Sequence, residues 1–253
     1  MVKNTFCRYE KKLLIPSEIE HDLQTALLEY MVPDEYNIDG KPYEICNLYF
    51  DDEHDSVIRH SISKPHYKEK LRLRSYGTPQ SMDSKVFLEI KKKCDGIGTK
   101  RRVAFTLADA YTYLNTGTHP VTKKYINGQV LDEIDYYLKV HPSEPKVYIS
   151  YLRNAFFGKE DSNVRITFDK EIITRRYDLA LEKGRYGDLL LPDGKILLEV
   201  KFLHAVPLWL AAIMSDFNLS FSSYSKYGRE FLKHSYEEIN ENNYRNCEMG
   251  EII

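Results

Sequence analysis

Hydrophobic and charged residues alternate along several segments of this chain. In the segment "KLRLRSYG", Lys70, Arg72 and Arg74 fall on one parity, while Leu71 and Leu73 fall on the other. Alternation of this kind is typical of a β-strand with one face in an apolar layer. Other strand-like runs are "TFCRYEKKLLI", "YEICNLYFD", "KVFLEIKKK", "KRRVAFT", "KVYISYLRNAFF", "VRITFDKEI" and "KILLEVKF". The sequence therefore predicts a protein dominated by strands.

Helical patterns lie between these strands. In "PSEIEHDLQTALLEYM", Ser17 and Glu20 form a capping-box motif. The segment "TLADAYTYLNTG" has the same motif at Thr106 and Asp109 and ends at Gly117. Further helices are predicted in "GQVLDEIDYYLKV", "AVPLWLAAIMSDF" and "SYSKYGREFLKHSYEEI". Long strands connected by helices indicate a single α+β domain over residues 1–253, built on a large antiparallel sheet or barrel.

The charged residues share parities from strand to strand, and two architectures fit this pattern. The shared positions are Arg8, Glu10 and Lys12; Lys70, Arg72 and Arg74; Glu89, Lys91 and Lys93; Lys100 and Arg102; Tyr151 and Arg153; Arg165 and Asp169; Glu199 and Lys201. In an open sheet these faces would meet water. In a closed barrel they would line the interior, and the apolar faces would pack against the helices. Because helices such as "VPLWLAAI" need an apolar surface to cover, we predict an antiparallel β tunnel barrel of about eight strands with helices packed outside.

The charge balance places any site for a polyanion inside this barrel. The net charge is −2 at pH 7, so the protein lacks the overall positive charge of a general polyanion binder. The predicted interior nevertheless holds more cations than carboxylates, and an unpaired buried charge costs several kcal/mol. Arginine grips phosphate oxygens in pairs and lysine supplies a point charge, so a phosphate chain is the natural occupant. Glutamates among the cations indicate a divalent metal carried on that chain.

Other sequence features narrow the setting of the protein. There is no N-terminal signal pattern and no run of about 18 apolar residues, so we expect no membrane span and a cytoplasmic location. The four cysteines lack metal-ligand spacing and are interpreted as free thiols. The histidines form no acid–base pair by spacing. The acidic segment "DDEHD" at residues 51–55 suits a helix N-terminus better than a metal cluster.

Nine segments taken in order resemble one known family. They are "RYEKK", "NLYFDD", "KLRLRSYG", "FLEIKKK" with "GTKRRV", "YLRNAFFG", "VRITFDKEI", "LLEVKF", "PLWL" and "SYSKYG". The set is similar to the VTC family, which is the polyphosphate polymerase domain of the vacuolar transporter chaperone complex and its bacterial relatives. That family belongs to the triphosphate tunnel metalloenzymes. The similarity runs from Phe6 to Phe231 and rests on the ordered set rather than on any one segment.

The resemblance implies an activity, a cofactor and a set of site residues. The family folds as an antiparallel tunnel barrel and transfers the γ-phosphate of ATP to a growing inorganic polyphosphate chain, with Mn²⁺ or Mg²⁺ as the metal. The implied catalytic, phosphate-gripping residues are Lys12, Arg72, Arg74, Lys91, Arg153, Arg165 and Lys226. The expected substrate-binding residues are Arg8, Lys70, Lys93, Lys100, Arg102, Tyr151, Lys201 and Ser225. Either Lys100 or Arg102 matches the basic position of "TKRRV". Glu199 matches the metal-binding glutamate, and Glu89 and Glu10 are further candidate metal ligands.

The sequence departs from the family pattern in two ways. The wider tunnel superfamily often has two alternating glutamates before the first lysine, whereas this chain has only Glu10 before Lys12. Fewer carboxylates argue for fewer metal ions and against two-metal hydrolysis. The regulatory phosphate-sensing domain and the membrane helices of the eukaryotic complex are also missing. Control and membrane coupling are therefore expected either from a membrane-protein partner supplied in trans or not at all. The resemblance implies ATP and inorganic polyphosphate as ligands.

Two other functions remain open from the sequence. One is a tunnel triphosphatase that hydrolyses a nucleoside triphosphate or polyphosphate with water. The other is a non-catalytic polyphosphate-binding module. A nucleic acid is not expected as a partner, because base-stacking aromatic residues are not interleaved with the cations.

Overall fold

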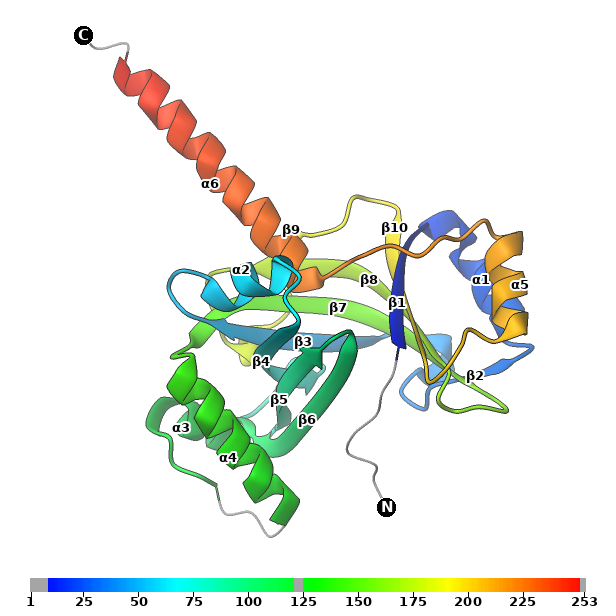
Figure 1. The fold of residues 1–253 in the computed structure, drawn as a ribbon, viewed down its shortest axis with the longest axis horizontal. Helices are drawn as coiled ribbons and strands as arrows, with labels where there is room; N and C mark the ends of the chain where they lie inside the picture. Colours follow the sequence, from blue (N-terminus) through cyan, green and yellow to red (C-terminus); the bar gives the residue numbers. More distant parts are fainter. Residues whose placement is uncertain (1–8, 121–124, 251–253) are drawn as a thin grey trace.

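The structure is one large antiparallel sheet with helices on its outside (Figure 1). The computed structural model describes residues 9–120 and 125–250, with side chains except those of residues 125–126 and 241–250. The strands are β1 (Tyr9–Pro16), β2 (Met31–Pro33), β3 (Tyr43–Asp51), β4 (Tyr67–Tyr76), β5 (Lys85–Cys94), β6 (Ile97–Thr106), β7 (Glu144–Gly158), β8 (Arg165–Arg175), β9 (Asp188–Leu189) and β10 (Lys195–Phe202). The helices are α1 (Glu20–Leu27), α2 (Ser56–Ile62), α3 (Leu107–Thr116), α4 (Tyr125–Val140), α5 (Leu208–Asp216) and α6 (Lys226–Gly250).

The sheet curls into a tunnel without closing its ring of backbone hydrogen bonds. Its strand order is β1-β10-β8-β7-β3-β4-β5-β6, with β2 added beside β7 and β9 beside β8. Among the described strands, β1 and β6 stand at the two ends of this path and do not pair with each other. The two halves nevertheless meet across the interior, since Lys91 Nζ on β5 is 3.3 Å from Glu10 Oε2 on β1. The predicted antiparallel α+β architecture is confirmed, and an ion pair spans the seam where a closed barrel would have a backbone ladder.

The outer face of the sheet carries the hydrophobic core. On one half, apolar residues of β3 to β7, such as Leu48, Leu73 and Leu88, pack against α3 and α4. On the other half, residues of β1, β8 and β10, such as Leu13 and Phe168, pack against α1 and α5. The alternation seen in the sequence therefore separates the two faces, with the apolar parity outside, under the helices, and the charged parity inside.

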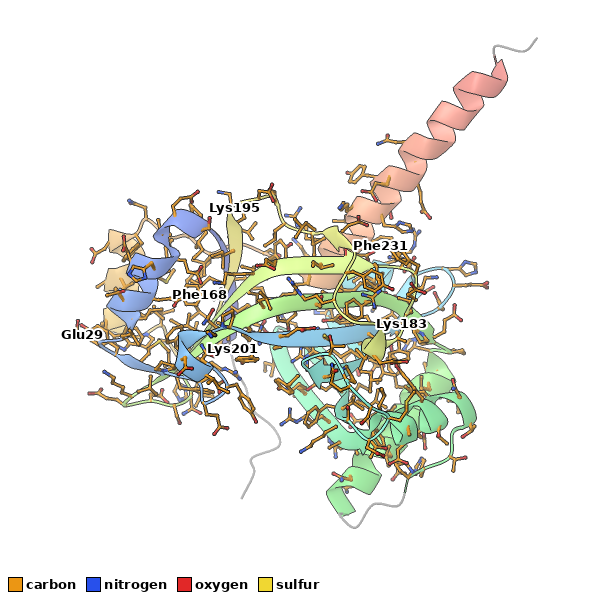
Figure 2. The ribbon with its side chains drawn as sticks, turned by 180° about the vertical axis from the view of Figure 1, so that it is seen from behind. Glu29, Phe168, Lys183, Lys195, Lys201 and Phe231 are labelled. Atoms are coloured by element: carbon orange, nitrogen blue, oxygen red, sulfur yellow. The ribbon has the colours of Figure 1, made fainter. Side chains whose placement is uncertain are left out.

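One end of the interior is filled by apolar side chains. Ile45, Ile149 and Leu197 on the inner face pack with Tyr227 and Phe231 of α6 and with residues of α2. Figure 2 places Phe231 at the base of α6, against the strands, and the rest of α6 projects away from the body (Figure 1). The first turn of α6 therefore closes one end of the lumen with apolar side chains, and the charged residues lie farther along the inner face.

The predicted helix signals have different outcomes. Thr106 caps α3 as expected, because its hydroxyl accepts the Asp109 backbone N–H at 3.1 Å and the helix ends at Gly117 with φ of 70°. The prediction of a capping box at Ser17 is wrong. Residues Ser17–Ile19 form a 3-10 turn without a side-chain cap, and Glu20 instead pairs with Lys170 on β8 at 2.8 Å.

The acidic segment after β3 serves a helix N-terminus, as predicted. The Asp51 carboxylate accepts the backbone N–H groups of Val57 and Ile58, at 2.8 and 2.9 Å, and Asp52 accepts that of Ser56. Carboxylates at this position satisfy donors that have no partner within the helix. None of the helices in the described part of the chain is both long and apolar enough to cross a lipid bilayer.

Candidate functional site

The inner face of the sheet brings the predicted basic residues of seven strands into one lumen. The backbone register places Arg72 opposite Glu89, and Glu89 opposite Arg102. On the other half of the sheet it places Lys12 opposite Glu199. Since residues opposite one another on neighbouring strands point to the same side, these charges share a face by construction.

Glu89 lies at the centre of a group of cations and is fully buried. Arg72 Nη2 is 2.7 Å from its Oε2, and Lys100 Nζ is 3.1 Å from its Oε1. Arg102 Nη1 and Arg74 Nε lie at 3.9 and 4.0 Å. Lys100 and Arg102 therefore both reach the lumen, although only one of them was expected to match the family position. We call these residues the Glu89 cluster: Glu89, Arg72, Arg74, Lys100 and Arg102.

The cations determine the charge state of the Glu89 cluster. Burial alone would raise the pKa of Glu89, but Arg72, Arg74 and Lys100 outweigh it and hold that pKa well below the usual value. Burial lowers the pKa of Lys100 to about 8, because Glu89 only partly offsets the loss of water and the repulsion from Arg72 and Arg74. One carboxylate thus faces more positive charge than it can neutralise.

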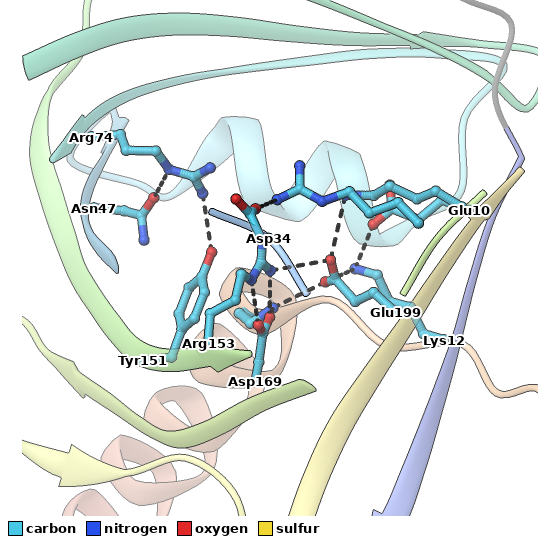
Figure 3. Close-up of polar contacts among 12 residues, drawn as sticks. Glu10, Lys12, Asp34, Asn47, Arg74, Tyr151, Arg153, Asp169 and Glu199 are labelled. Carbon is cyan, nitrogen blue, oxygen red and sulfur yellow. Dashed lines mark hydrogen bonds and ion pairs between the residues drawn. The ribbon is translucent and has the colours of Figure 1, made fainter. Parts of the chain in front are cut away.

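Glu199 and Asp169 form a second group with different proportions (Figure 3). Lys226 Nζ is 2.5 Å from Asp169 Oδ2 and 3.0 Å from Glu199 Oε1. Arg153 donates to both oxygens of Asp169, at 2.6 and 2.7 Å, and reaches Glu199 Oε2 at 3.4 Å. Lys12 Nζ is 3.3 Å from Glu199 Oε1. We call these residues the Glu199 cluster: Glu199, Asp169, Glu10, Lys12, Arg153, Lys201 and Lys226.

The Glu199 cluster favours the charged forms of its members, with the exception of Lys201. Burial would raise the pKa of Glu199, yet Lys226, Lys12 and Lys201 keep it well below the usual value. Burial would lower the pKa of Lys226, yet Asp169 and Glu199 raise it instead. These opposite shifts are those of buried ions that stabilise one another. Lys201 differs, because burial lowers its pKa to about 8.

Tyr151 connects the two clusters. Its hydroxyl accepts a hydrogen bond from Arg74 Nη2 at 3.1 Å. Its ring lies under the Arg153 guanidinium at 5.1 Å and under Lys226 Nζ at 4.5 Å. Cations over an aromatic face are attracted by the electron density of the ring. Tyr151 thus contacts cations of both clusters and lies between them.

Several predicted site residues lie away from the two clusters. Arg8 lies outside the described residues. Lys93 is exposed near the β5–β6 turn. The Ser225 hydroxyl accepts the backbone N–H of Gly228 at 3.1 Å, so it caps the start of α6. Lys70 is half-buried on the inner face, and burial together with repulsion from Lys91 and Lys68 lowers its pKa to about 7. Arg165 reaches Asp34 at the open end of the lumen.

Some lumen residues were absent from the predicted site. The alternation in "VRITFDK" assigned Asp169 to the same face as Arg165, but Asp169 was not among the predicted site residues. Asn47 accepts from Arg74 Nε at 2.8 Å, and the Tyr49 hydroxyl accepts from Arg72 at 3.1 Å. No charge marks the inner parity of β3 between Tyr43 and Tyr49, so the charge pattern gave no signal there.

The lumen carboxylates fit a metal that a phosphate chain would carry. In the described residues the one group with three closely placed metal-ligand atoms is His119, Asp132 and Asp135, which is exposed and outside the lumen. Divalent ions of the magnesium type commonly use one or two carboxylates and take their remaining ligands from phosphate and water. The ionised Glu199 can supply such a carboxylate. Directly opposite it, the buried Thr167 hydroxyl has no hydrogen-bond partner among the described residues, so polar capacity remains beside Glu199.

The curled sheet and its charged interior define an α+β protein of the tunnel type. A solved structure from Bacillus halodurans, described as a candidate adenylate cyclase, has a similar fold, with a TM-score of 0.53. The match covers 88% of this chain and 95% of that chain at 13% sequence identity, so it shows a shared fold only.

The family is shown by the sequence itself. The VTC domain model matches residues 7–233, so the chain belongs to the VTC domain family, as the ordered segments predicted. No curated protein matches the chain. Family and fold together support a tunnel enzyme that binds polyphosphate or a nucleotide.

Proposed function

We propose that this protein is an inorganic polyphosphate polymerase that transfers the γ-phosphate of ATP to a growing polyphosphate chain inside the lumen. The observation that carries the proposal is the Glu89 cluster, in which a single buried carboxylate faces four cations. Arg74 is buried and Arg72 nearly so, while Lys100 and Arg102 are exposed to the lumen, so the positive excess can take up an anion that enters from outside. In a lumen that belongs to a VTC domain, a phosphate chain is such an anion.

The arginines of the lumen bind and orient the phosphates. Arg72 and Arg74 come from the same strand at alternate positions, so both guanidinium groups face one stretch of the lumen. Arg153 faces them from β7, on the other side of Tyr151. Phosphoryl transfer requires in-line positioning and neutralisation of the equatorial oxygens, and guanidinium groups provide both.

The nucleophile in this proposal is a terminal oxygen of polyphosphate, which is already ionised at neutral pH. A general base is therefore unnecessary. No histidine in the described part of the chain forms a hydrogen bond or an ion pair with a member of either cluster. Glu199, with Glu89 and Glu10 as further candidates, would hold a divalent metal that neutralises charge on the transferred phosphoryl group.

Product analysis tests this proposal. Purified protein is incubated with ATP and Mn²⁺, and polyphosphate is separated from free phosphate by electrophoresis. We expect polyphosphate chains longer than the triphosphate of a single ATP molecule, and we expect no such chains from the Arg74→Ala variant. Arg229→Ala is the matched control, because Arg229 is exposed on α6.

Two other products would change the assignment. Free phosphate without polyphosphate would replace the polymerase by a tunnel triphosphatase. Binding of polyphosphate without nucleotide consumption, with Mn²⁺ or Mg²⁺, would leave a non-catalytic binding module. A cytoplasmic location and a membrane partner supplied in trans stay predictions from the sequence.

A further inference from the structure

The open end of the lumen is a pocket walled by aromatic rings. Its volume is about 890 Å³, within the range of small-molecule sites. Its aromatic lining residues come from five separate segments and are Tyr36, Tyr43, Tyr76, Phe87 and Phe157. We call this pocket the aromatic mouth. The phosphate-binding role proposed above does not use these rings, because phosphates do not stack on aromatic faces.

The rings of the aromatic mouth are arranged as an exposed platform. Tyr36 and Tyr76 stack at 5.8 Å between centroids with an interplanar angle of 16°. The Tyr43 ring packs against both of them in a tilted orientation, and the Phe87 ring packs edge-on against Tyr76 with an interplanar angle of 89°. Tyr36 is 55% exposed and Tyr76 is 43% exposed, although each is large and hydrophobic. A platform that served only the core would be covered, and this one faces the pocket.

Cations connect the aromatic mouth with the charged lumen. Arg102 lines the pocket with its guanidinium 4.6 Å from the Phe87 ring, and it also belongs to the Glu89 cluster. Arg165 lines the opposite wall, 4.7 Å from the Phe157 ring. Its buried Nε has no hydrogen-bond partner among the described residues. The pocket therefore offers flat aromatic surface outside and, further in, two guanidinium groups, one of which has an unsatisfied donor.

We propose that the aromatic mouth binds the nucleoside part of a nucleoside triphosphate, with the base stacked on the Tyr36–Tyr76 platform and the phosphates directed inward past Arg102 and Arg165. The inference extends the proposed function, since it names the site that takes the nucleoside of its substrate. A nucleoside triphosphate has an aromatic base at one end and a chain of negative charges at the other. The pocket has aromatic rings at its outer end and guanidinium groups at its inner end, so the two match in order. The other end of the inner face is filled by Tyr227 and Phe231, so the nucleoside has its room at the aromatic mouth.

The assignment gives the nucleotide one orientation in the tunnel. The phosphate next to the ribose would meet Arg102 and Arg165, and the γ-phosphate would lie deeper, near Arg72 and Arg74. Inorganic triphosphate carries the same charges without the base and would use the inner sites alone. Comparison of the two ligands therefore isolates the contribution of the aromatic mouth.

The test measures binding of ATP and of inorganic triphosphate by calorimetry, with EDTA present so that no turnover occurs. The double variant Tyr36→Ala/Tyr76→Ala should weaken ATP binding roughly tenfold or more and change triphosphate binding less than about twofold. Tyr36→Phe/Tyr76→Phe keeps the rings and should bind ATP as the wild type does. Tyr136→Ala is the matched control, because Tyr136 is 68% exposed on α4, outside the pocket.

A second readout reports stacking directly. The triphosphate of 2-aminopurine riboside should lose fluorescence on binding to the wild type and to the phenylalanine variant, and keep it with the alanine variant. Equal losses of affinity for ATP and triphosphate, or unchanged ATP binding in the alanine variant, would overturn the proposal. Loss of ATP selectivity in a protein that makes no polyphosphate would support this site while the polymerase assignment fails. Polyphosphate synthesis with unchanged ATP binding in the alanine variant would do the reverse.

Discussion

The two charged clusters of the lumen differ in how far their carboxylates neutralise their cations. In the Glu199 cluster, three carboxylates face four cations, and most ions have a partner of opposite sign within 4.0 Å. In the Glu89 cluster, one carboxylate faces four cations. The first is close to neutral by itself, whereas the second keeps a positive excess that no further carboxylate among the described residues neutralises within 4.0 Å.

The difference indicates separate tasks within one lumen. A nearly balanced network holds its side chains in fixed positions and is well suited to place a metal and a reacting phosphate. In an unbalanced network the cations repel one another in the empty protein, and a polyanion that enters relieves this repulsion. In the proposed function, the Glu89 cluster would supply affinity for the phosphates, and the Glu199 cluster would fix their position.

The largest expected effect comes from removing the sole carboxylate of the Glu89 cluster. Glu89→Gln should lower the free energy of unfolding of the ligand-free protein by about 3–5 kcal/mol, because four cations lose their only counter-ion. Glu199→Gln should cost less, since Asp169 and Glu10 remain in its cluster. Urea unfolding of both variants measures the difference, and equal losses would show that the two clusters are alike.

The next effect concerns turnover. Glu199→Gln should lower kcat about 100-fold with a smaller change in affinity for ATP, because a metal ligand acts most strongly on charge that develops in the transition state. Arg74→Ala should lower kcat and also weaken ATP binding, since a guanidinium holds the phosphates in both states. Steady-state kinetics with Mn²⁺ separate the two patterns. Glu237→Gln, an exposed change on α6, serves as the control.

A smaller effect is the pH dependence of binding. The pKa of Lys70 is lowered to about 7 by burial and by repulsion from Lys91 and Lys68, so this lysine is largely neutral in the empty lumen above that pH. A bound polyanion favours the charged form and raises the pKa, so binding takes up a proton. Affinity for inorganic triphosphate should therefore fall several-fold between about pH 6.5 and pH 8.5.

Calorimetry in buffers of different ionisation enthalpy measures this proton uptake. Lys70→Met should flatten the pH dependence and reduce the uptake. An unchanged pH profile in that variant would assign the titration to another group.

The smallest effect lies outside both clusters. Thr106→Ala removes the cap of α3 and should lower the free energy of unfolding by about 1 kcal/mol. Because α3 packs on the outer face, triphosphate affinity should stay unchanged. Thermal unfolding with and without triphosphate checks this, and a change in affinity would mean that the outer layer controls the geometry of the lumen.

The sequence carries most of the information on the fold. Strict alternation in β4 assigned Arg72 and Arg74 to one face and Leu71 and Leu73 to the other, and the structure has the leucines fully buried outside. The antiparallel α+β architecture followed because apolar helices need apolar strand faces. That the chain forms a single domain over 1–253, and that each site residue has its predicted role, remain proposals.

The remaining features depend on distances that a linear pattern does not contain. Glu20 looked like part of a capping box, but Lys170 on a distant strand provides a stronger partner for its carboxylate. Ser225 looked like a ligand beside Lys226, whereas its hydroxyl is used by the backbone of α6. The division of the lumen into two clusters could not be predicted from the sequence either. Parity shows which face of a strand a residue lies on, but not which residues of other strands it contacts.

A β-bulge in β8 shows how one extra residue determines which side chains line the lumen. Glu171 has φ of 45°, and the β7–β8 register shifts at that level. The extra residue lets Asp169 face the cations and Ile172 face the apolar end of the lumen, although their sequence spacing is odd. Each strand keeps one parity facing the lumen, and the extra residue of this bulge changes which parity of β8 faces inward. During evolution, loops tolerate the gain or loss of residues. A single deletion within β8 would instead turn the inward-facing side chains of the rest of the strand outward, and the outward-facing ones inward.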